Sequence, residues 1–146
     1  MAATDFLSDE EKKEIALAIQ AAEGGTIGEI RVYLEKKCKD DAMTRALKIF
    51  GQLKMELTKD RTGVLIYIAH DDRVFAILGD EGINAKVPEN FWDEVKELMA
   101  ASFAEGNFVS GIKSAIGQCG IHLQKHFPGH EQDTNELSDE VVIGNE

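Results

Sequence analysis

The sequence predicts an α/β fold: a three-layer α/β/α sandwich around a small mixed, Rossmann-like sheet. Residues 30–68 follow the order strand, helix, strand, which predicts two parallel strands joined by a right-handed crossover. Two apolar runs, at 64–69 and 74–78, flank the polar tetrad at 70–73 and are too short for helices, so they predict an antiparallel hairpin. Since neither run alternates polar with apolar residues, we expect the hairpin to form the middle of the sheet, with helices on both faces.

The first helix and the first strand have clear sequence signals. Ser8 followed by Glu11 is a capping box, which predicts a helix over 9–22 that ends before a glycine pair. Residues 30–35 alternate apolar with polar side chains, as expected for a strand. Because one face of this strand is wetter, we expect it to lie nearer to the edge of the sheet than the hairpin does.

Three further helices are predicted. Asp40 or Asp41 caps the second helix, over 42–57, and its inward face is expected to contain Met43, Ala46, Phe50, Leu53 and Leu57. Pro88 opens the third helix, which runs through Phe103, and Asn107 caps the fourth, which ends at His126. The core is expected to include Leu53, Ile66, Phe75, Trp92 and Ile116.

Length and composition favour one domain, over 1–128, followed by an acidic segment over 129–146 that is either an extended strap or disordered. The chain of 146 residues has a formal charge of −11 and a pI of about 4.8, which argues against nucleic acid and anionic membranes as partners. Cys38 and Cys119 are far apart and are expected to be reduced thiols. With no signal peptide and no long apolar run, we expect a cytoplasmic monomer.

The predicted topology gathers carboxylates at two ends of the sheet. One end, which we call the Asp80 rim, brings together Glu29, Asp60, Arg61, Asp80 and Glu81. Carboxylate oxygens are the ligands that Mg²⁺ and Ca²⁺ prefer, so the four acids of this rim are candidate metal ligands. Arg61 is a candidate for binding a substrate phosphate through its guanidinium group. The alternative is an ordinary polar loop, with Asp80 and Glu81 in solvent and Glu29 paired with Arg31 or Arg61.

The other end, which we call the Asp71 rim, holds Asp40, Asp41, Asp71 and Asp72, with His70 and Lys36 nearby. It lies beyond the carboxyl ends of the parallel strands, where ligands of open α/β sheets usually bind. Turn and cap chemistry also explains these acids, so the choice between the two rims stays open.

A third cluster of candidate ligands lies on the fourth predicted helix. Cys119, His122 and His126 have a spacing that superficially suggests zinc. Cys119 falls on the apolar stripe of that helix, however, and is better interpreted as a core residue. No second thiolate or nearby acid completes a tetrahedral ligand set, so the sequence does not favour a zinc site.

Several segments together resemble the TPM-domain family in its short, stand-alone cytoplasmic form. These segments are TIGEIRVYLE (26–35), TKDRTGVLIYIA (58–69), FAILGDEGIN (75–84), FWDEVKELM (91–99), FAEGNFVSGI (103–112) and NELSDEV (135–141). The resemblance runs from Phe6 to about Val141. It implies an α/β/α sandwich, divalent-metal binding and, as in some members, phosphatase activity on phosphate monoesters.

The residues and the resemblance together predict a divalent-metal-binding domain that hydrolyses phosphate monoesters with the help of the metal. Mg²⁺ or Ca²⁺ would be the cofactor, and Asp80 and Arg61 would carry the catalysis. The sequence contains neither a nucleophile elbow nor a phosphate-cradling glycine loop. The alternative function is a non-catalytic metal-binding or protein-interaction module whose acidic surface meets a protein partner.

Overall fold

A computed structural model of the protein describes residues 7–58, 60–129 and 141–143. The elements in chain order are α1 (Asp9–Glu23), β1 (Glu29–Glu35), α2 (Ala42–Gln52), the 3₁₀ turn η2 (Met55–Leu57), β2 (Gly63–Ala69), β3 (Val74–Gly79), α3 (Glu81–Asn84), α4 (Phe91–Ala104), α5 (Phe108–His126) and β4 (Val142–Ile143). Over the described residues the strands form one sheet of four, in the order β3-β2-β1-β4.

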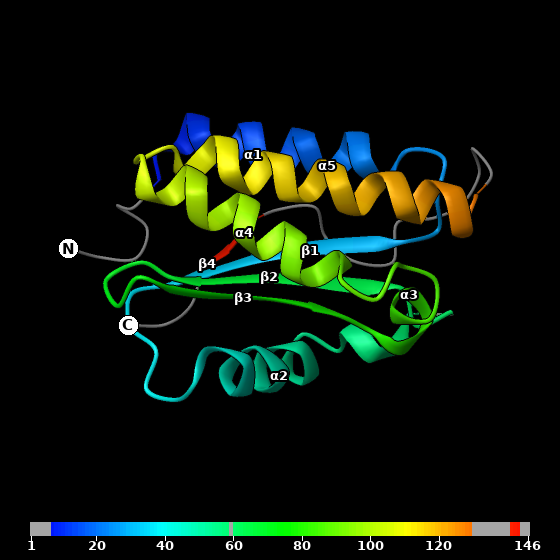
Figure 1. Ribbon diagram of the computed structural model, residues 1–146, viewed down its shortest axis with the longest axis horizontal. Helices are drawn as coiled ribbons and strands as arrows, with labels where there is room; N and C mark the ends of the chain where they lie inside the picture. Colours follow the sequence, from blue (N-terminus) through cyan, green and yellow to red (C-terminus); the bar gives the residue numbers. More distant parts are fainter. Residues whose placement is uncertain (1–6, 59, 130–140, 144–146) are drawn as a thin grey trace.

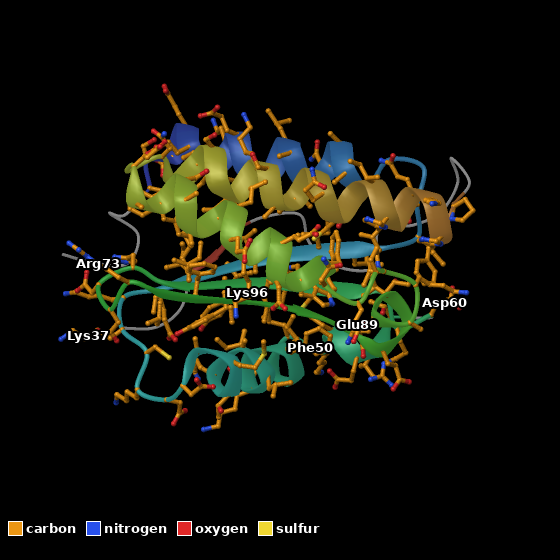
Figure 2. The ribbon with its side chains drawn as sticks, viewed as in Figure 1. Lys37, Phe50, Asp60, Arg73, Glu89 and Lys96 are labelled. Carbon is orange, nitrogen blue, oxygen red and sulfur yellow. The ribbon has the colours of Figure 1, made fainter. Side chains whose placement is uncertain are left out.

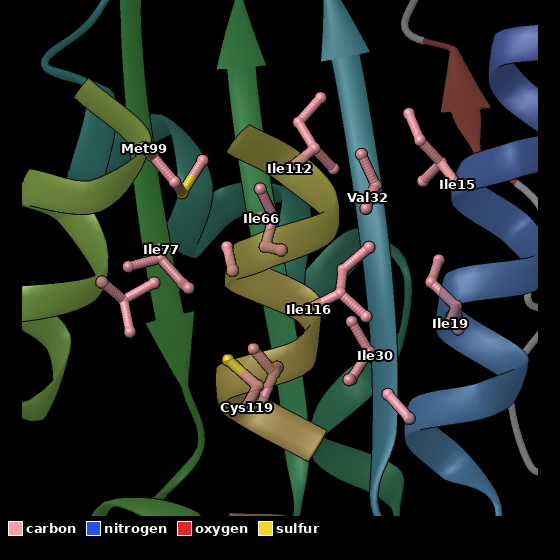
Figure 3. Packing of buried hydrophobic residues seen from close by; sticks show 14 of the residues in the cluster. Ile15, Ile19, Ile30, Val32, Ile66, Ile77, Met99, Ile112, Ile116 and Cys119 are labelled. Carbon is pink, nitrogen blue, oxygen red and sulfur yellow. The ribbon is translucent and has the colours of Figure 1, made fainter. Parts of the chain in front are cut away.

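Helices cover both faces of this sheet, so the predicted three-layer α/β/α sandwich is confirmed (Figure 1). Helices α1, α4 and α5 lie on one face and α2 lies on the other. The larger of two hydrophobic clusters lies under the three helices, where Ile30 and Val32 of β1 meet Ile112, Ile116 and Cys119 of α5 (Figure 3). The smaller cluster lies under α2 and includes Ile49, Tyr67 and Met55.

The pairing of β1, β2 and β3 is the pairing that the sequence predicts. β1 and β2 are parallel, in a register that runs from Glu29 opposite Gly63 to Glu35 opposite Ala69. β2 and β3 are antiparallel, and Ala69 lies opposite Val74 across the turn. The starts of β1 and β2 and the end of β3 therefore share one edge of the fold, which is the Asp80 rim.

The predicted strand order needs a correction. The hairpin is not the middle of the sheet, because β3 is an edge strand, and β1 has β2 on one side and β4 on the other. The polar face of β1 is the reason that this strand was predicted to lie nearer to the edge of the sheet. Glu35 on that face is only 4% exposed, because the layer formed by α2 covers it and supplies Arg45 as an ionic partner. A polar face on a strand thus indicates a polar cluster inside this fold, not an edge.

The second helix is shorter than predicted. It ends at Gln52, and Lys54 then takes a left-handed conformation with φ of 57° before η2. This change of direction turns Met55 into the core and leaves Leu57 70% exposed. Met43 is also not an inward residue, since it is 36% exposed, whereas Ile49 is fully buried.

The other predicted helices form close to their expected boundaries. The capping box at Ser8 and Glu11 is present, with both reciprocal hydrogen bonds. Of the predicted core residues, Ile66 and Ile116 are fully buried, whereas Leu53, Phe75 and Trp92 are partly buried and pack against the two clusters. No helix of the described part is long and apolar enough to cross a membrane.

Most of the segment 129–146 lies outside the described residues, so its assignment as a strap or tail stays a prediction. Within the described residues, Val142 and Ile143 form β4 and pair in parallel with Tyr33 and Leu34 of β1. The domain boundary at 128 is likewise a prediction.

Candidate functional site

The Asp80 rim forms because three chain segments meet where β1 and β2 begin and β3 ends. The amide of Asp80 donates to the carbonyl of Gly63 at 2.9 Å, which extends the β2–β3 ladder by one bond. The amide of Glu29 donates to the carbonyl of Thr62 at 3.5 Å, which extends the β1–β2 ladder in the same way. In Figure 2, Asp60 marks this end of the sheet and Arg73 marks the opposite end.

The central feature of the Asp80 rim is a bidentate ion pair between Arg61 and Asp80. Arg61 Nε donates to Asp80 Oδ2 at 2.7 Å, and Arg61 Nη2 donates to Asp80 Oδ1 at 2.8 Å. The Asp80 side chain is only 6% exposed, whereas the Arg61 side chain is 43% exposed. The hydrogen bond to Asp80 raises the pKa of Arg61 above its ordinary value. This fork geometry is the strongest form of arginine–carboxylate contact.

Backbone contacts fix the loop that carries Arg61. Arg61 itself has a positive φ of 57°, a backbone conformation that residues other than glycine rarely adopt. Gly82, in the first turn of α3, donates its amide to the Arg61 carbonyl at 2.9 Å. A Cβ at Gly82 would lie 2.1 Å from the Asp60 carbonyl oxygen, so only glycine allows this approach. The Asp80 carboxylate also caps α3 by accepting from the amide of Glu81 at 2.8 Å.

The other acids of the rim have different environments. Glu29 is 3% exposed at the start of β1, whereas Asp60 is exposed. Glu81 is exposed and contacts Arg61 Nη1 at 3.4 Å. The alternative in which Asp80 lies in solvent is therefore wrong, because this carboxylate is buried beneath Arg61.

The residues of the rim suit a hard divalent cation by donor type, but not as a preformed ligand set. Carboxylate and hydroxyl oxygens are suitable donors, and the hydroxyl of Thr62 is buried here without a hydrogen-bond partner among the described residues. Both oxygens of Asp80, however, are taken by Arg61. Over residues 7–58, 60–129 and 141–143, no three His, Cys, Asp or Glu side chains are grouped so that they could hold a metal ion. A cation that coordinates Asp80 therefore has to compete with Arg61 for its oxygens.

The acids of the Asp71 rim mostly have structural partners. Asp41 caps α2 by accepting from the amide of Thr44 at 3.1 Å, and Asp72 accepts from the amide of Cys38 at 2.7 Å. Asp40 pairs with Lys48 at 3.0 Å, and Asp71 contacts His70 Nδ1 at 3.3 Å. These contacts are the cap and turn chemistry that the sequence offered as the alternative to a ligand site.

A buried polar cluster close to the Asp71 rim was not predicted from the sequence. Arg45 donates from Nε and Nη2 to Glu35 at 2.9 and 3.0 Å, and the Tyr67 hydroxyl also donates to Glu35. The Tyr67 side chain is fully buried. Its pKa is raised mainly by this burial and, to a smaller extent, by hydrogen bonds with Cys38 and Glu35. The signal in the sequence was a glutamate that ends a strand and an arginine ten positions later on the covering helix, a pattern with no motif of its own.

The zinc interpretation of α5 has no support in the described residues. Cys119 is buried in the core, and burial raises the pKa of its thiol to about 12, which disfavours the thiolate that a metal needs. His122 and His126 stack with ring centroids 6.1 Å apart at the end of the helix.

Comparison with known proteins identifies the family. A profile of the TPM domain matches residues 1–120, which is most of the chain. The chain belongs to the TPM-domain family. The BA42 protein from the psychrophilic bacterium Bizionia argentinensis, solved by NMR, is 44% identical; the match covers 95% of this chain and 96% of BA42, with a TM-score of 0.87. No curated protein matches the chain.

Two more distant structures share the fold. The N-terminal domain of a protein from P. gingivalis is 18% identical with a TM-score of 0.71, over 86% of this chain and 83% of that domain. The N-terminal domain of the cg2496 protein from Corynebacterium glutamicum is 12% identical with a TM-score of 0.67, over 90% of this chain and 86% of that domain. At these identities the likeness concerns the fold alone.

Proposed function

We propose that this TPM-domain protein binds a divalent cation, Mg²⁺ or Ca²⁺, together with a phosphate monoester at the Asp80 rim, and that it hydrolyses the ester slowly. The observation that carries the proposal is the Arg61–Asp80 pair, which holds one positive and one negative group side by side at the edge of the sheet. Membership of the TPM-domain family supports the same proposal, since the matching family model is named for a phosphatase. The resemblance noted in the sequence implies divalent-metal binding and, as in some members, phosphatase activity.

The proposal treats the ion pair as a closed resting state. A phosphate dianion offers Arg61 an acceptor with the same fork geometry as a carboxylate, and a divalent cation offers Asp80 a partner of higher charge. Phosphate binding to Arg61 frees Asp80 for the cation, and cation binding to Asp80 frees Arg61 for the phosphate. Binding of the ester and of the cation should therefore be mutually favourable, and each should strengthen the other by the same factor.

The residues around the pair have separate roles in this proposal. Asp80 and Glu81, with Asp60 and the buried Glu29 nearby, would supply oxygen ligands, and Arg61 would hold phosphate oxygens. The cation, once bound, would neutralise phosphate charge and acidify a bound water. The exposure of the Arg61 side chain, at 43%, lets it turn towards solvent without opening the core.

Turnover of p-nitrophenyl phosphate with Mg²⁺, with and without EDTA, tests the proposal. We expect Asp80→Asn to abolish turnover, and Arg61→Ala to act chiefly on KM if Arg61 binds the ground state and the transition state equally. The matched control is Asp71→Asn, the same change at the Asp71 rim, which should leave turnover unchanged. Circular dichroism and urea unfolding show whether each variant is folded at the assay temperature.

Three outcomes would contradict the proposal. Turnover that survives both EDTA and Asp80→Asn would indicate a contaminant or another mechanism. Loss of turnover in Asp71→Asn alone would move the site to the opposite rim. No turnover above the buffer rate in the wild type would leave the protein as a non-catalytic binding module.

A further inference from the structure

A hollow at the end of the molecule away from the Asp80 rim is not used by the proposed function. It has a volume of about 600 Å³ and lies between the β2–β3 turn, the end of α4 and the start of α5. Figure 1 shows these three segments together at one end of the sheet, and Figure 2 places Arg73 there. We call it the Phe103 groove. It is lined by Ile68, Ala69, His70, Arg73, Val74, Phe75, Ala100, Phe103, Ala104, Gly106 and Phe108.

The wall of the groove is mainly aromatic and aliphatic. Phe75 and Phe103 meet edge to face with ring centroids 5.2 Å apart, and Phe103 meets Phe108 at 5.3 Å, so the three rings make a continuous row. Val74 is 36% exposed, and Ala100 and Ala104 are exposed on the α4 side. The size and the lining match those of small-molecule sites, which are concave, mostly apolar and contain a few polar groups.

The lining of the groove differs in charge from the protein as a whole. The chain carries a formal charge of −11, but none of the described residues that line the groove is acidic, and Arg73 lies among them. No described carboxylate forms an ion pair with Arg73. The acids next to the lining residues in the sequence have other contacts. Asp71 contacts His70 Nδ1 at 3.3 Å, Asp72 accepts from the amide of Cys38 at 2.7 Å, and Glu105 accepts from Asn107 at 3.4 Å.

The backbone at Arg73 holds this cation at the edge of the groove. Arg73 has a positive φ of 54°, a left-handed conformation that asparagine or glycine would adopt at lower cost. The positive end of α5, a helix of 19 residues, adds a potential of the same sign at the same place. A guanidinium beside an apolar wall is suited to a planar carboxylate, which it can bind through two hydrogen bonds.

We propose that the Phe103 groove binds an amphipathic carboxylate: a ligand with one carboxylate group, which Arg73 binds, on an aliphatic or aromatic body that lies against Phe75, Phe103 and Phe108. This site is separate from the Asp80 rim and requires neither a metal nor a phosphate. Its ligand class differs from that of the proposed activity. The two proposals can therefore fail independently.

Titration with decanoate below its micelle concentration, followed by amide NMR shifts and calorimetry, tests this proposal. We expect shifts centred on residues 68–75 and 100–108, weaker binding of butyrate, and weaker binding of decyltrimethylammonium, which has the same chain and the opposite charge. Arg73→Asn should weaken decanoate binding about tenfold while keeping the left-handed backbone. Ala104→Trp should block binding by filling the groove from an exposed helix position.

The matched control is Lys125→Gln, which removes one exposed cation from the far end of α5 and should leave decanoate affinity unchanged. Equal affinity for decanoate and decyltrimethylammonium would overturn the proposal. Arg73→Asn with wild-type affinity, or shifts centred outside the groove, would also overturn it. Sedimentation that shows a wild-type dimer dissociated by Ala104→Trp would instead identify the groove as a self-association surface, and the proposal would fail.

Discussion

Among the described residues, two bidentate arginine–carboxylate pairs lie at opposite ends of the same sheet, and their surroundings differ. Arg61 and Asp80 meet at the Asp80 rim, where the carboxylate is 6% exposed and the arginine is 43% exposed. Arg45 and Glu35 meet under α2, where the carboxylate is also 6% exposed but the arginine is only 25% exposed. Similar hydrogen bonds therefore lie in a more exposed setting at one end of the sheet and in a more covered setting at the other.

Each carboxylate also accepts a third hydrogen bond, and the donors of these two bonds differ. Glu35 accepts from the hydroxyl of the fully buried Tyr67, so its network continues into the core. Asp80 accepts from the amide of Glu81, in a helix of four residues, so its network ends at the surface. We infer that the Glu35 pair stabilises the fold, whereas the Asp80 pair can open to admit ligands at modest cost.

The largest effect is expected from Glu35→Gln. This change leaves the Arg45 guanidinium without a charged partner and leaves the Tyr67 hydroxyl with a weaker acceptor. We expect the free energy of unfolding to fall by about 2–3 kcal/mol, less than for a fully buried pair because Arg45 is partly solvated. Urea unfolding at pH 7 measures it, and a loss too small to resolve would remove the distinction between the two pairs.

Gly82→Ala should have the next largest effect, because the new methyl group meets the carbonyl oxygens of Asp60 and Arg61 at 2.1 and 2.6 Å. We expect a loss of about 2 kcal/mol in the free energy of unfolding. The matched control is Gly117→Ala in α5, where a Cβ meets nothing within 4 Å. The control should gain about 0.5–1 kcal/mol from helix propensity. Equal effects at the two glycines would refute the tight approach of α3 to the Arg61 loop.

Asp80→Asn should destabilise the fold less than Glu35→Gln does. Asparagine keeps an acceptor for the Glu81 amide, and the released Arg61 guanidinium can be solvated where it stands. Urea unfolding of the two variants under identical conditions gives the comparison directly. A larger loss for Asp80→Asn would mean that the Asp80 pair is the structural one, and the ligand-exchange proposal would lose its basis.

The smallest effect concerns the pH dependence of stability. At the same end of the molecule as the Asp80 rim, His122 of α5 packs against Phe91, with ring centroids 4.6 Å apart. Burial, with smaller contributions from His126 and Lys125, lowers the pKa of His122. Because the unfolded chain then binds the proton more readily, stability should fall as pH drops through about 6.5 and below. His122→Gln should flatten the slope of stability against pH between pH 7 and pH 5, and an unchanged slope would contradict this assignment.

The sequence predicts most of this fold because hydrophobic periodicity and turn chemistry are local signals. The register of the hairpin follows from the four polar residues His70–Arg73, and the parallel pair follows from the length of the crossover. The position of β1 could not be predicted, because β4 comes from a segment of two residues more than a hundred positions away. Lys54 and Arg61 have left-handed backbone conformations although neither is glycine. Residue propensities do not predict this conformation for lysine or arginine.

The grouping of the candidate residues at one rim was predicted, but the contacts among them were not. Strand geometry brings Arg61 and Asp80 to the same rim, as expected, but the ion pair between them depends on the left-handed turn at Arg61 and on the approach of Gly82. The spacing of residues in the sequence predicts neither the left-handed turn at Arg61 nor the approach of Gly82. The same limit hid the Glu35–Arg45–Tyr67 cluster, since its members belong to three elements and form no motif.

In the proposed function, Arg61 competes with a divalent cation for Asp80. The most direct measurement is a Ca²⁺ titration followed by amide NMR shifts, on the wild type and on Arg61→Gln in parallel. We expect shifts centred on residues 60–63 and 79–82, and an affinity about threefold or more higher in Arg61→Gln, because the competing cation is gone. Equal or weaker Ca²⁺ binding in Arg61→Gln, or shifts centred on residues 36–41 and 70–73, would contradict the claim.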